Sequence, residues 1–201
     1  MNKENFDNHL PSEKEIGGKA RNLLILKKEG FNIPDFFVIP YTNLENIELK
    51  EIVKNITYKT QHFKKDFILR SSATGEDSKD NSFAGIFESI RIKDVFNLNT
   101  GLKNILKSLD SEKLSFYIQL KKIKEKPKLS IIVQEFIEGN VSGVMFSSTI
   151  KNGKKGTLIN SNFGGASSIV EGQDSDSFFV DEKGNIFEKA KHKEIFSLTD
   201  N

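Results

Sequence analysis

A cation followed at once by two hydroxyl groups marks the part of this sequence best suited to binding a polyphosphate. The apolar residues 67–69 predict a short buried strand, and Arg70, Ser71 and Ser72 follow it directly. A guanidinium group neutralises phosphate charge through a fork of N–H donors, and backbone N–H groups can approach phosphate oxygens where side chains are small. The same pattern also fits a strand that ends in a solvated arginine and continues as an ordinary surface loop.

A second place suited to phosphate lies earlier in the chain. Gly17, Gly18 and Lys19 open a predicted helix that runs from residue 20 to residue 29. A helix N-terminus carries partial positive charge, and two glycines leave its backbone accessible. Taken alone, the motif fits a simple turn followed by a solvated lysine better than a phosphate site.

The composition excludes several classes of function. The chain has 30 basic and 28 acidic residues, and this balance does not predict binding to nucleic acid. It has no cysteine, which excludes disulfides and thiolate metal sites. Its apolar runs are too short to span a bilayer, and no apolar segment of a secretory signal follows the N-terminus, so we expect a soluble, cytoplasmic protein. The rarity of arginine, present only as Arg21, Arg70 and Arg91, favours a specific role for Arg70 as a rigid bidentate donor.

The remaining periodicity predicts both helices and strands in the first half of the chain and mainly strands in the second half. Residues 36–39 and 86–92 read as strands, and residues 95–109 and 114–124 as helices. Residues 42–65 are polar with weak helical periodicity and read as a connector. In the second half, residues 129–137 and 141–149 read as strands that a turn at Gly139 and Asn140 would pair as a hairpin. A strand at residues 157–160 and a last hairpin, residues 178–181 with 185–187, complete the prediction.

Candidates for metal binding are numerous but not distinctive. His9, His62 and His192 lie in separate polar contexts, without a second histidine or carboxylate at the spacing of metal ligands. Magnesium takes one or two carboxylates together with phosphate oxygens. The acidic residues that could serve are Glu76, Asp77, Glu135, Glu171, Asp174 and Asp176. The sequence does not single out one of them.

Four motifs, in order from residue 17 to about residue 181, resemble those of the pyruvate, phosphate dikinase and phosphoenolpyruvate synthase family. Residues 17–23 and 34–39 are similar to its opening, and residues 70–77 with 82–85 to its phosphate-binding strand and lid loop. Residues 133–137 and 141–146 resemble its hinge strand and the hairpin after it, and residues 160–172 its glycine-rich block near the metal. The same nucleotide-binding unit occurs in rifamycin phosphotransferases and in kinases for unusual acceptors.

The resemblance implies an α+β, ATP-grasp-like fold with two lobes, whose mixed or antiparallel sheets are flanked by helices. The whole chain, residues 1–201, would be one nucleotide-binding domain, with one lobe at about residues 16–125 and the other at about 128–190. The cofactors would be ATP and Mg²⁺. The family transfers a phosphoryl or pyrophosphoryl group from ATP to a histidine on a separate carrier domain, so the expected partners are such a carrier domain or chain and an acceptor-binding domain. No motif of the carrier histidine is present in this sequence.

The resemblance also assigns residues by position. Lys19 and Arg70 would contact the phosphates as catalytic residues, and Asn160 would neighbour the metal. The other residues assigned to the nucleotide are Ser71, Ser72 and Thr74 after the strand, Ser82, Phe83, Ala84 and Gly85 in the lid, Gln134, Glu135 and Phe136 in the hinge that meets adenine, and Gly143.

Two departures from the family pattern keep a second function open. The glycine-rich block reads Gly164-Gly165-Ala166-Ser167, so Ser167 stands where the family has a carboxylate. The family glutamate near Asn160 is also absent. Loss of acidic groups weakens the retention of Mg²⁺. The alternative is therefore a degenerate, non-catalytic module that binds nucleotide or serves as a scaffold.

Overall fold

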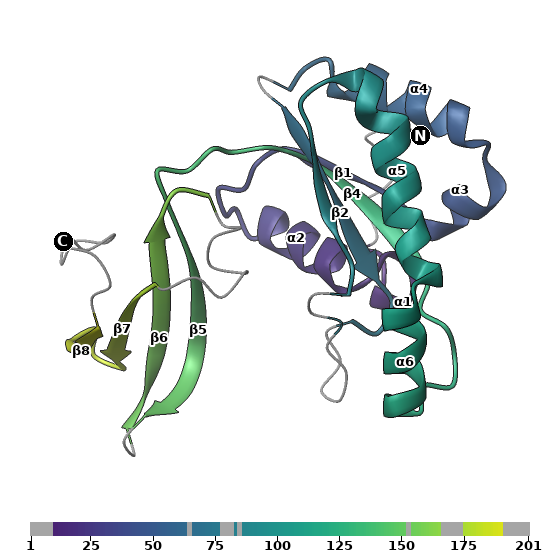
Figure 1. Ribbon diagram of the computed structural model, residues 1–201. Coiled ribbons are helices and arrows are strands. Elements are labelled where there is room, and N and C mark those ends of the chain that lie inside the picture. Colours follow the sequence, from purple (N-terminus) through teal and green to yellow (C-terminus); the bar gives the residue numbers. More distant parts are fainter. Residues whose placement is uncertain are drawn as a thin grey trace. The chain divides into compact units, whose positions relative to one another are not determined.

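The computed structural model describes residues 10–63, 66–76, 83, 86–151, 154–165 and 175–190. The chain divides into two compact units, Met1–Ile137 and Glu138–Asn201. Each unit contains a four-stranded sheet in which neighbouring strands run antiparallel. Helices of the first unit pack on its sheet, as Figure 1 shows. The α+β class with antiparallel sheets is confirmed.

The sheet of the first unit has the strand order β1-β4-β2-β3. Its strands are β1 (Phe36–Ile39), β2 (Phe67–Ala73), β3 (Ser89–Ile92) and β4 (Leu129–Glu135). β4 is central because it pairs with β1 on one side and β2 on the other. Residues 129–134 are all buried, as expected for a strand covered on both faces.

The position of β4 corrects two expectations. The second lobe does not begin near residue 128, because β4 belongs to the first sheet and the chain divides after Ile137. The strands at residues 129–137 and 141–149 do not pair as a hairpin, since β4 and β5 (Val141–Lys151) lie in different sheets. Local turn chemistry at Gly139 and Asn140 was outweighed by the burial that β4 gains between β1 and β2.

One face of this sheet carries the main apolar core beneath helices α4 (Leu49–Thr60) and α5 (Leu98–Lys107). α4 contributes Ile52 and Ile56, and α5 contributes Leu98, Leu102 and Ile105. Residues 42–65, expected to be a connector, form most of α3 (Tyr41–Asn46) and all of α4. The apolar residues of α4 recur at helical spacing, so about three turns of largely polar sequence can still bury one apolar stripe.

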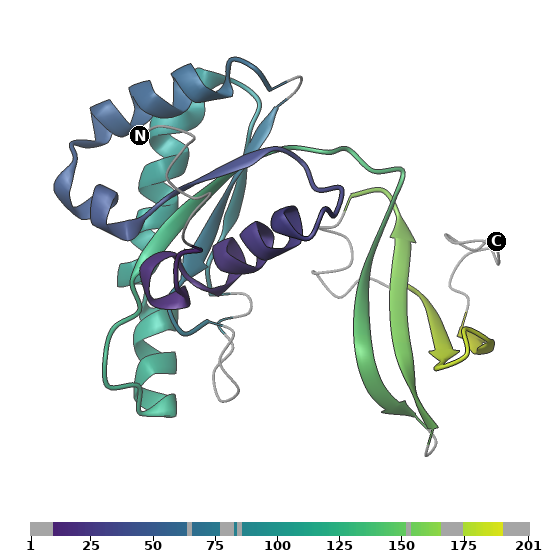
Figure 2. The same cartoon turned by 180° about the vertical axis from the view of Figure 1, so that it is seen from behind.

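The opposite face carries α1 (Glu13–Ile16) and α2 (Gly18–Lys28), visible from behind in Figure 2. Ile16 and Ala20 pack there against Val38 of β1 and Ile132 of β4. Ser12 and Glu15 form a capping box that starts α1. Gly17 separates the two helices with φ of 79° and ψ of 162°, a backbone conformation that only glycine adopts readily. We call this side of the sheet the α2 face.

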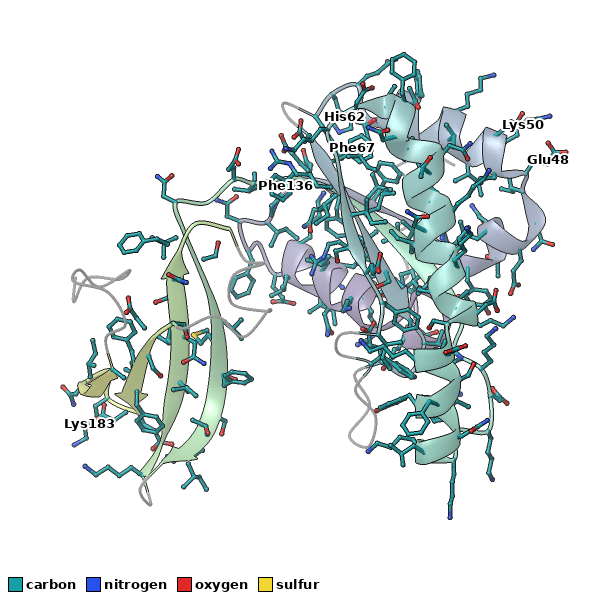
Figure 3. All side chains as sticks on the ribbon, in the orientation of Figure 1. Glu48, Lys50, His62, Phe67, Phe136 and Lys183 are labelled. Atoms are coloured by element: carbon teal, nitrogen blue, oxygen red, sulfur yellow. The ribbon has the colours of Figure 1, made fainter. Side chains whose placement is uncertain are left out.

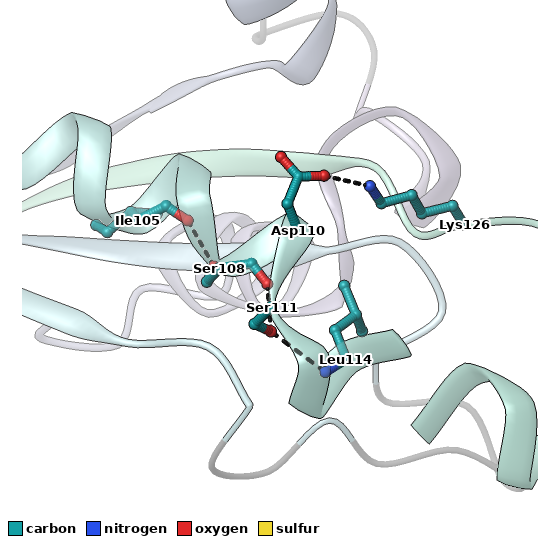
Figure 4. Close-up of polar contacts among 6 residues, drawn as sticks. All are labelled: Ile105, Ser108, Asp110, Ser111, Leu114 and Lys126. Carbon is teal, nitrogen blue, oxygen red and sulfur yellow. Dashed lines mark hydrogen bonds and ion pairs between the residues drawn. The ribbon is translucent and has the colours of Figure 1, made fainter. Parts of the chain in front are cut away.

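A capped corner joins α5 to α6 (Glu112–Lys121) through a short helix, η3 (Ser108–Asp110). Figure 4 shows its contacts: the Ser111 hydroxyl accepts a hydrogen bond from the Leu114 N–H over 3.2 Å and donates one to the Ser108 carbonyl over 2.8 Å. Asp110 pairs with Lys126 at 2.7 Å. A second short helix, η2 (Val95–Asn97), precedes α5. The two helices predicted at residues 95–109 and 114–124 are therefore confirmed, with small shifts at their ends.

The second unit contains strands β5 (Val141–Lys151), β6 (Lys154–Phe163), β7 (Asp176–Asp181) and β8 (Ile186–Ala190), paired in chain order. The β5 ladder is irregular between Phe146 and Thr149. Asp181 closes the turn between β7 and β8 by accepting hydrogen bonds from the N–H groups of Lys183 and Asn185. The last predicted hairpin is thus confirmed.

Candidate functional site

The alternation of side chains along β2 divides its residues between the two faces of the sheet. Ile68, Arg70 and Ser72 share the α2 face, where they lie opposite Gln134, Ile132 and Ser130 of β4. The strand predicted for residues 67–69 therefore extends through both serines to Ala73. The arginine and serine expected at a strand end instead belong to a regular, paired strand.

Arg70 is held in place by β4. Its Nη1 donates a hydrogen bond to Oε1 of Gln134 over 2.9 Å. Burial lowers the pKa of Arg70, and the negative charge of Glu76 raises it in part. A guanidinium group keeps its proton in proteins, so Arg70 remains a cation with further N–H donors.

Ser72 fastens α2 to the sheet. Its buried hydroxyl accepts a hydrogen bond from the N–H of Ala20 over 3.0 Å, which satisfies one of the unpaired N–H groups of the helix N-terminus. Gly17 approaches β2 so closely that a Cβ atom there would lie 2.5 Å from the carbonyl oxygen of Ser72. Gly17 and Ser72 therefore position the first turn of α2, which carries Lys19.

Lys19 forms an ion pair with a carboxylate that follows β2. Its Nζ lies 2.7 Å from Oε1 of Glu76, whose side chain is only 4% exposed. Oε2 of Glu76 accepts a hydrogen bond from the N–H of Ala73 over 3.2 Å. Glu76 was one of six carboxylates considered for magnesium, and sequence reasoning did not connect it with Lys19. The available signal was the spacing of three positions between Ala73 and Glu76, since a turn of this length can return a carboxylate to the end of its own strand.

Two of the predicted phosphate ligands do not join this group. Ser71 is buried and lies on the opposite face, with Leu69 and Ala73 of the main core. The Thr74 hydroxyl accepts a hydrogen bond from the N–H of Lys128 over 2.9 Å, and the Thr74 N–H donates to the Lys128 carbonyl. Ser71 therefore belongs to the main core, and the hydrogen bonds of Thr74 link the end of β2 to Lys128.

The predicted adenine hinge lies at the end of β4. The Glu135 N–H donates to the carbonyl of Asp35, and the Phe136 N–H donates to the carbonyl of Asp66, each over 2.8 Å. The guanidinium group of Arg91 lies over the Phe136 ring at 3.9 Å and forms an ion pair with Asp66 at 2.8 Å. Figure 3 shows Phe136 at this end of the sheet. The backbone N–H groups of the two hinge residues are thus already engaged.

Of the four predicted lid residues, Phe83 is described, and Ser82, Ala84 and Gly85 lie outside the described residues. The Phe83 side chain is 2% exposed, in the main core. Its ring centroid lies 5.2 Å from that of Tyr117 and 5.7 Å from that of Phe87. The side chain of Phe83 therefore belongs to the main core, and any contact of this residue with phosphate would come from its backbone.

Asn160 and Gly143 belong to the second unit. The Asn160 amide oxygen accepts a hydrogen bond from the Ser177 hydroxyl over 2.9 Å, and Gly143 allows close pairing of β5 and β6, because a Cβ atom there would lie 2.8 Å from the Asn160 carbonyl oxygen. Asp176 pairs with Ser161, so its side chain lies on the other face from Asn160. The described residues contain no group of three or more His, Cys, Asp or Glu that could hold a metal ion. Asp77, Ser167, Glu171 and Asp174 lie outside the described residues.

One of the three histidines lies in the described part of the chain. His62, labelled in Figure 3, is exposed, and its ring centroid lies 4.8 Å from that of Phe63. His9 and His192 lie outside the described residues. Every helix in the described part of the chain is too short or too polar to cross a bilayer.

Comparison with known proteins gives the family. A family model described as the pyruvate phosphate dikinase AMP/ATP-binding domain matches residues 45–200, which include Arg70, Glu76 and Gln134 and begin after Lys19. An uncharacterized phosphotransferase, YvkC, of Bacillus subtilis (strain 168) is 29% identical over 92% of this chain and 26% of its own length. Phosphoenolpyruvate synthase of Pyrococcus furiosus is 28% identical over 74% of this chain and 18% of its own.

The solved D-alanine-D-alanine ligase of Coxiella burnetii aligns with 83% of this chain and 44% of its own, at 9% identity and a TM-score of 0.36, too low a likeness to support any conclusion. The chain spans about a quarter or less of the two relatives named above. The family model, in contrast, covers more than half of the chain. The chain therefore belongs to the pyruvate phosphate dikinase AMP/ATP-binding domain family.

Proposed function

We propose that the chain binds ATP on the α2 face of its first unit, with the triphosphate held by Lys19 and Arg70. The observation that carries this proposal is the arrangement of these two cations, one paired with Glu76 and the other within its electrostatic influence. A chain of the AMP/ATP-binding family that pairs a lysine with a buried carboxylate, whose charge also acts on a nearby arginine, presents two cations that can contact phosphate oxygens.

Lys19 and Arg70 would act differently. The Lys19 side chain is 35% exposed, and after pairing with Glu76 its ammonium group has two N–H donors left for phosphate oxygens. Arg70 uses one N–H for Gln134 and offers the rest of its fork. Ser72 would position α2 rather than bind phosphate, because its oxygen accepts the Ala20 N–H.

Adenine would lie at the hinge of residues 134–136. Because the N–H groups of Glu135 and Phe136 are engaged, contact with the base would use backbone carbonyl groups or the Phe136 side chain. We retain residues 82–85 as the proposed lid, Mg²⁺ as a proposed companion of the phosphates and an ATP-grasp-like arrangement as the proposed fold family. Asn160, in the second unit, stays a sequence-based prediction for the metal.

We further propose that the bound ATP donates a phosphoryl or pyrophosphoryl group to a histidine on a separate carrier domain or chain, leaving ADP or AMP respectively. An acceptor-binding domain would then take the group from that histidine. The names of the relatives, a phosphotransferase and phosphoenolpyruvate synthases, support this class of reaction. Such a transfer depends on positioning and on neutralising charge, which Lys19 and Arg70 can supply.

The second candidate is a module that binds nucleotide without turnover. In its favour, the sequence has Ser167 where the family resemblance places a carboxylate, and loss of an acidic group there would weaken the retention of Mg²⁺. The two candidates share the ATP site and differ only in the transfer step.

Calorimetric titration with ATP tests the shared step. Lys19→Ala and Arg70→Ala should each weaken binding by about 10- to 100-fold, since a hydrogen bond to a charged group is worth roughly 1.5–3 kcal/mol. Lys28→Ala is the matched control, because it removes an exposed lysine from the other end of the same helix. No measurable affinity in the wild-type chain, or equal losses for Lys19→Ala and Lys28→Ala, would refute the proposed site.

A labelling experiment separates the two candidates. The chain is mixed with a carrier-histidine domain of a relative and with ATP labelled at either the β or the γ phosphorus. Label on the histidine would support transfer, and the position of the label would distinguish a phosphoryl from a pyrophosphoryl group. ATP binding without label in either experiment would favour the non-catalytic module.

A further inference from the structure

Glu76 combines burial with charge in a way that a surface residue does not. Its side chain is 4% exposed, and ionised carboxylates are rarely so buried unless they are paired. One carboxylate oxygen accepts the N–H of Ala73, at the end of β2, and the other lies 2.7 Å from Lys19 Nζ. Both oxygens are therefore engaged, and the carboxylate is anchored to the strand that also carries Arg70.

We propose that Glu76 is a positioning residue for the nucleotide, which holds the Lys19 ammonium in place for the phosphates and stays paired with it when ATP binds. This inference rests on the proposed binding of ATP. The ammonium group has three donors, and Glu76 occupies one of them. Protein kinases use a lysine–glutamate ion pair for the same purpose, on an unrelated fold.

Two physical reasons favour a Glu76 that holds Lys19 in place over a Glu76 that competes with the phosphates for Lys19. A free lysine side chain has about 2 kcal/mol of rotamer entropy, part of which is lost on binding unless a partner has already ordered the chain. Glu76 also offsets the repulsion between the two cations of the site, since its charge acts on Arg70 as well as on Lys19. If Glu76 instead competed with the phosphates, its neutralisation would tighten ATP binding.

A double-mutant cycle decides between these cases. Calorimetry with ATP on the full chain compares the wild type, Glu76→Gln, Lys19→Ala and the double variant. Glutamine keeps the size of the side chain and can still accept the Ala73 N–H, but it removes the charge. We expect Glu76→Gln to weaken ATP binding by about 10-fold, as for one charged hydrogen bond, and to change affinity by less than about twofold when Lys19 is already alanine.

Several outcomes would overturn the proposal. Equal or tighter binding by Glu76→Gln would show that Glu76 does not assist Lys19, and the same loss in both backgrounds would show a merely structural role. Glu112→Gln, an exposed substitution of the same kind, should leave affinity unchanged. If Glu76→Gln does not fold, Glu76→Asp replaces it; this variant keeps the charge but withdraws it by one methylene, and affinity equal to the wild type would then refute the proposal.

The experiment also separates this inference from the proposed function. A wild-type chain without affinity for ATP would overturn both. A wild-type chain that binds ATP, loses affinity in Lys19→Ala and is unaffected by Glu76→Gln would overturn the role of Glu76 alone.

Discussion

The close approach of Gly17 to β2 gives a prediction that does not depend on any ligand. Gly17→Ala would introduce a Cβ atom 2.5 Å from the carbonyl carbon and oxygen of Ser72, both backbone atoms of a central part of the sheet. It would also place a side chain at φ of 79° and ψ of 162°. Neither problem can be relieved by a side-chain rotation, so α2 would have to shift away from β2.

The expected loss is the sum of these two effects. Backbone strain at such a position costs about 1–3 kcal/mol, and forcing extra atoms into a packed contact costs about 1–3 kcal/mol more. We therefore expect Gly17→Ala to lower the free energy of unfolding by roughly 2–6 kcal/mol, a large part of the 5–15 kcal/mol typical of a domain. Gly30→Ala is a matched control, because Gly30 has φ of 80° but no heavy atom within 4 Å of the added Cβ. It should cost only about 1–2 kcal/mol.

Urea unfolding followed by tyrosine fluorescence measures this difference in the first unit alone. The chain has no tryptophan, and its three tyrosines, Tyr41, Tyr58 and Tyr117, all lie in that unit. With a slope of about 1–3 kcal/mol per molar urea, the midpoint for Gly17→Ala should fall by about 1 M or more. Equal midpoints for the Gly17 and Gly30 variants would refute the reasoning, because α2 would then yield to the added methyl group without cost.

Two further predictions concern α4 and the second unit. Ile56→Ala should destabilise the first unit by about 2–5 kcal/mol, because Ile56 is fully buried in the main core. Lys54→Ala, at an exposed position of the same helix, should change the stability by less than about 0.5 kcal/mol. Similar losses for the two variants in the same urea assay would contradict the packing of α4. Hydrogen bonds from Asn185 lower the pKa of Asp181 below its ordinary value of 3.8, so this residue stabilises the fold above the unfolded-state pKa and the contribution is lost as the pH falls through the lower folded-state pKa. A carboxyl-carbon NMR titration should place the Asp181 midpoint below 3.8 and return it toward 3.8 in Asn185→Ala, and an unchanged midpoint would refute the assignment.

Local patterns in the sequence predicted most of the elements. The helix after Gly17, the strand that carries Arg70 and the helices around residues 95–124 all follow from periodicity and turn residues that act within a few positions. The long-range pairing of β4 was not predictable in the same way. A strand buried on both faces is recognised by its neighbours, and β1 and β2 lie far from it in the chain. The polar composition of residues 42–65 similarly concealed α4, whose buried stripe consists of two isoleucines.

Some features of the candidate site follow from the sequence alone, and others only from the tertiary structure. The sequence alone determined which groups could meet a phosphate, because the charge of Lys19 and Arg70 and the small size of Gly17 are properties of the residues themselves. Only the tertiary structure decided which of them share a surface. The pleat of β2 places Arg70 and Ser72 on the α2 face and Ser71 on the other, and the turn after β2 returns Glu76 to Lys19, 57 positions earlier in the chain. Such contacts depend on the packing of α2 against the sheet, which no local stretch of sequence encodes.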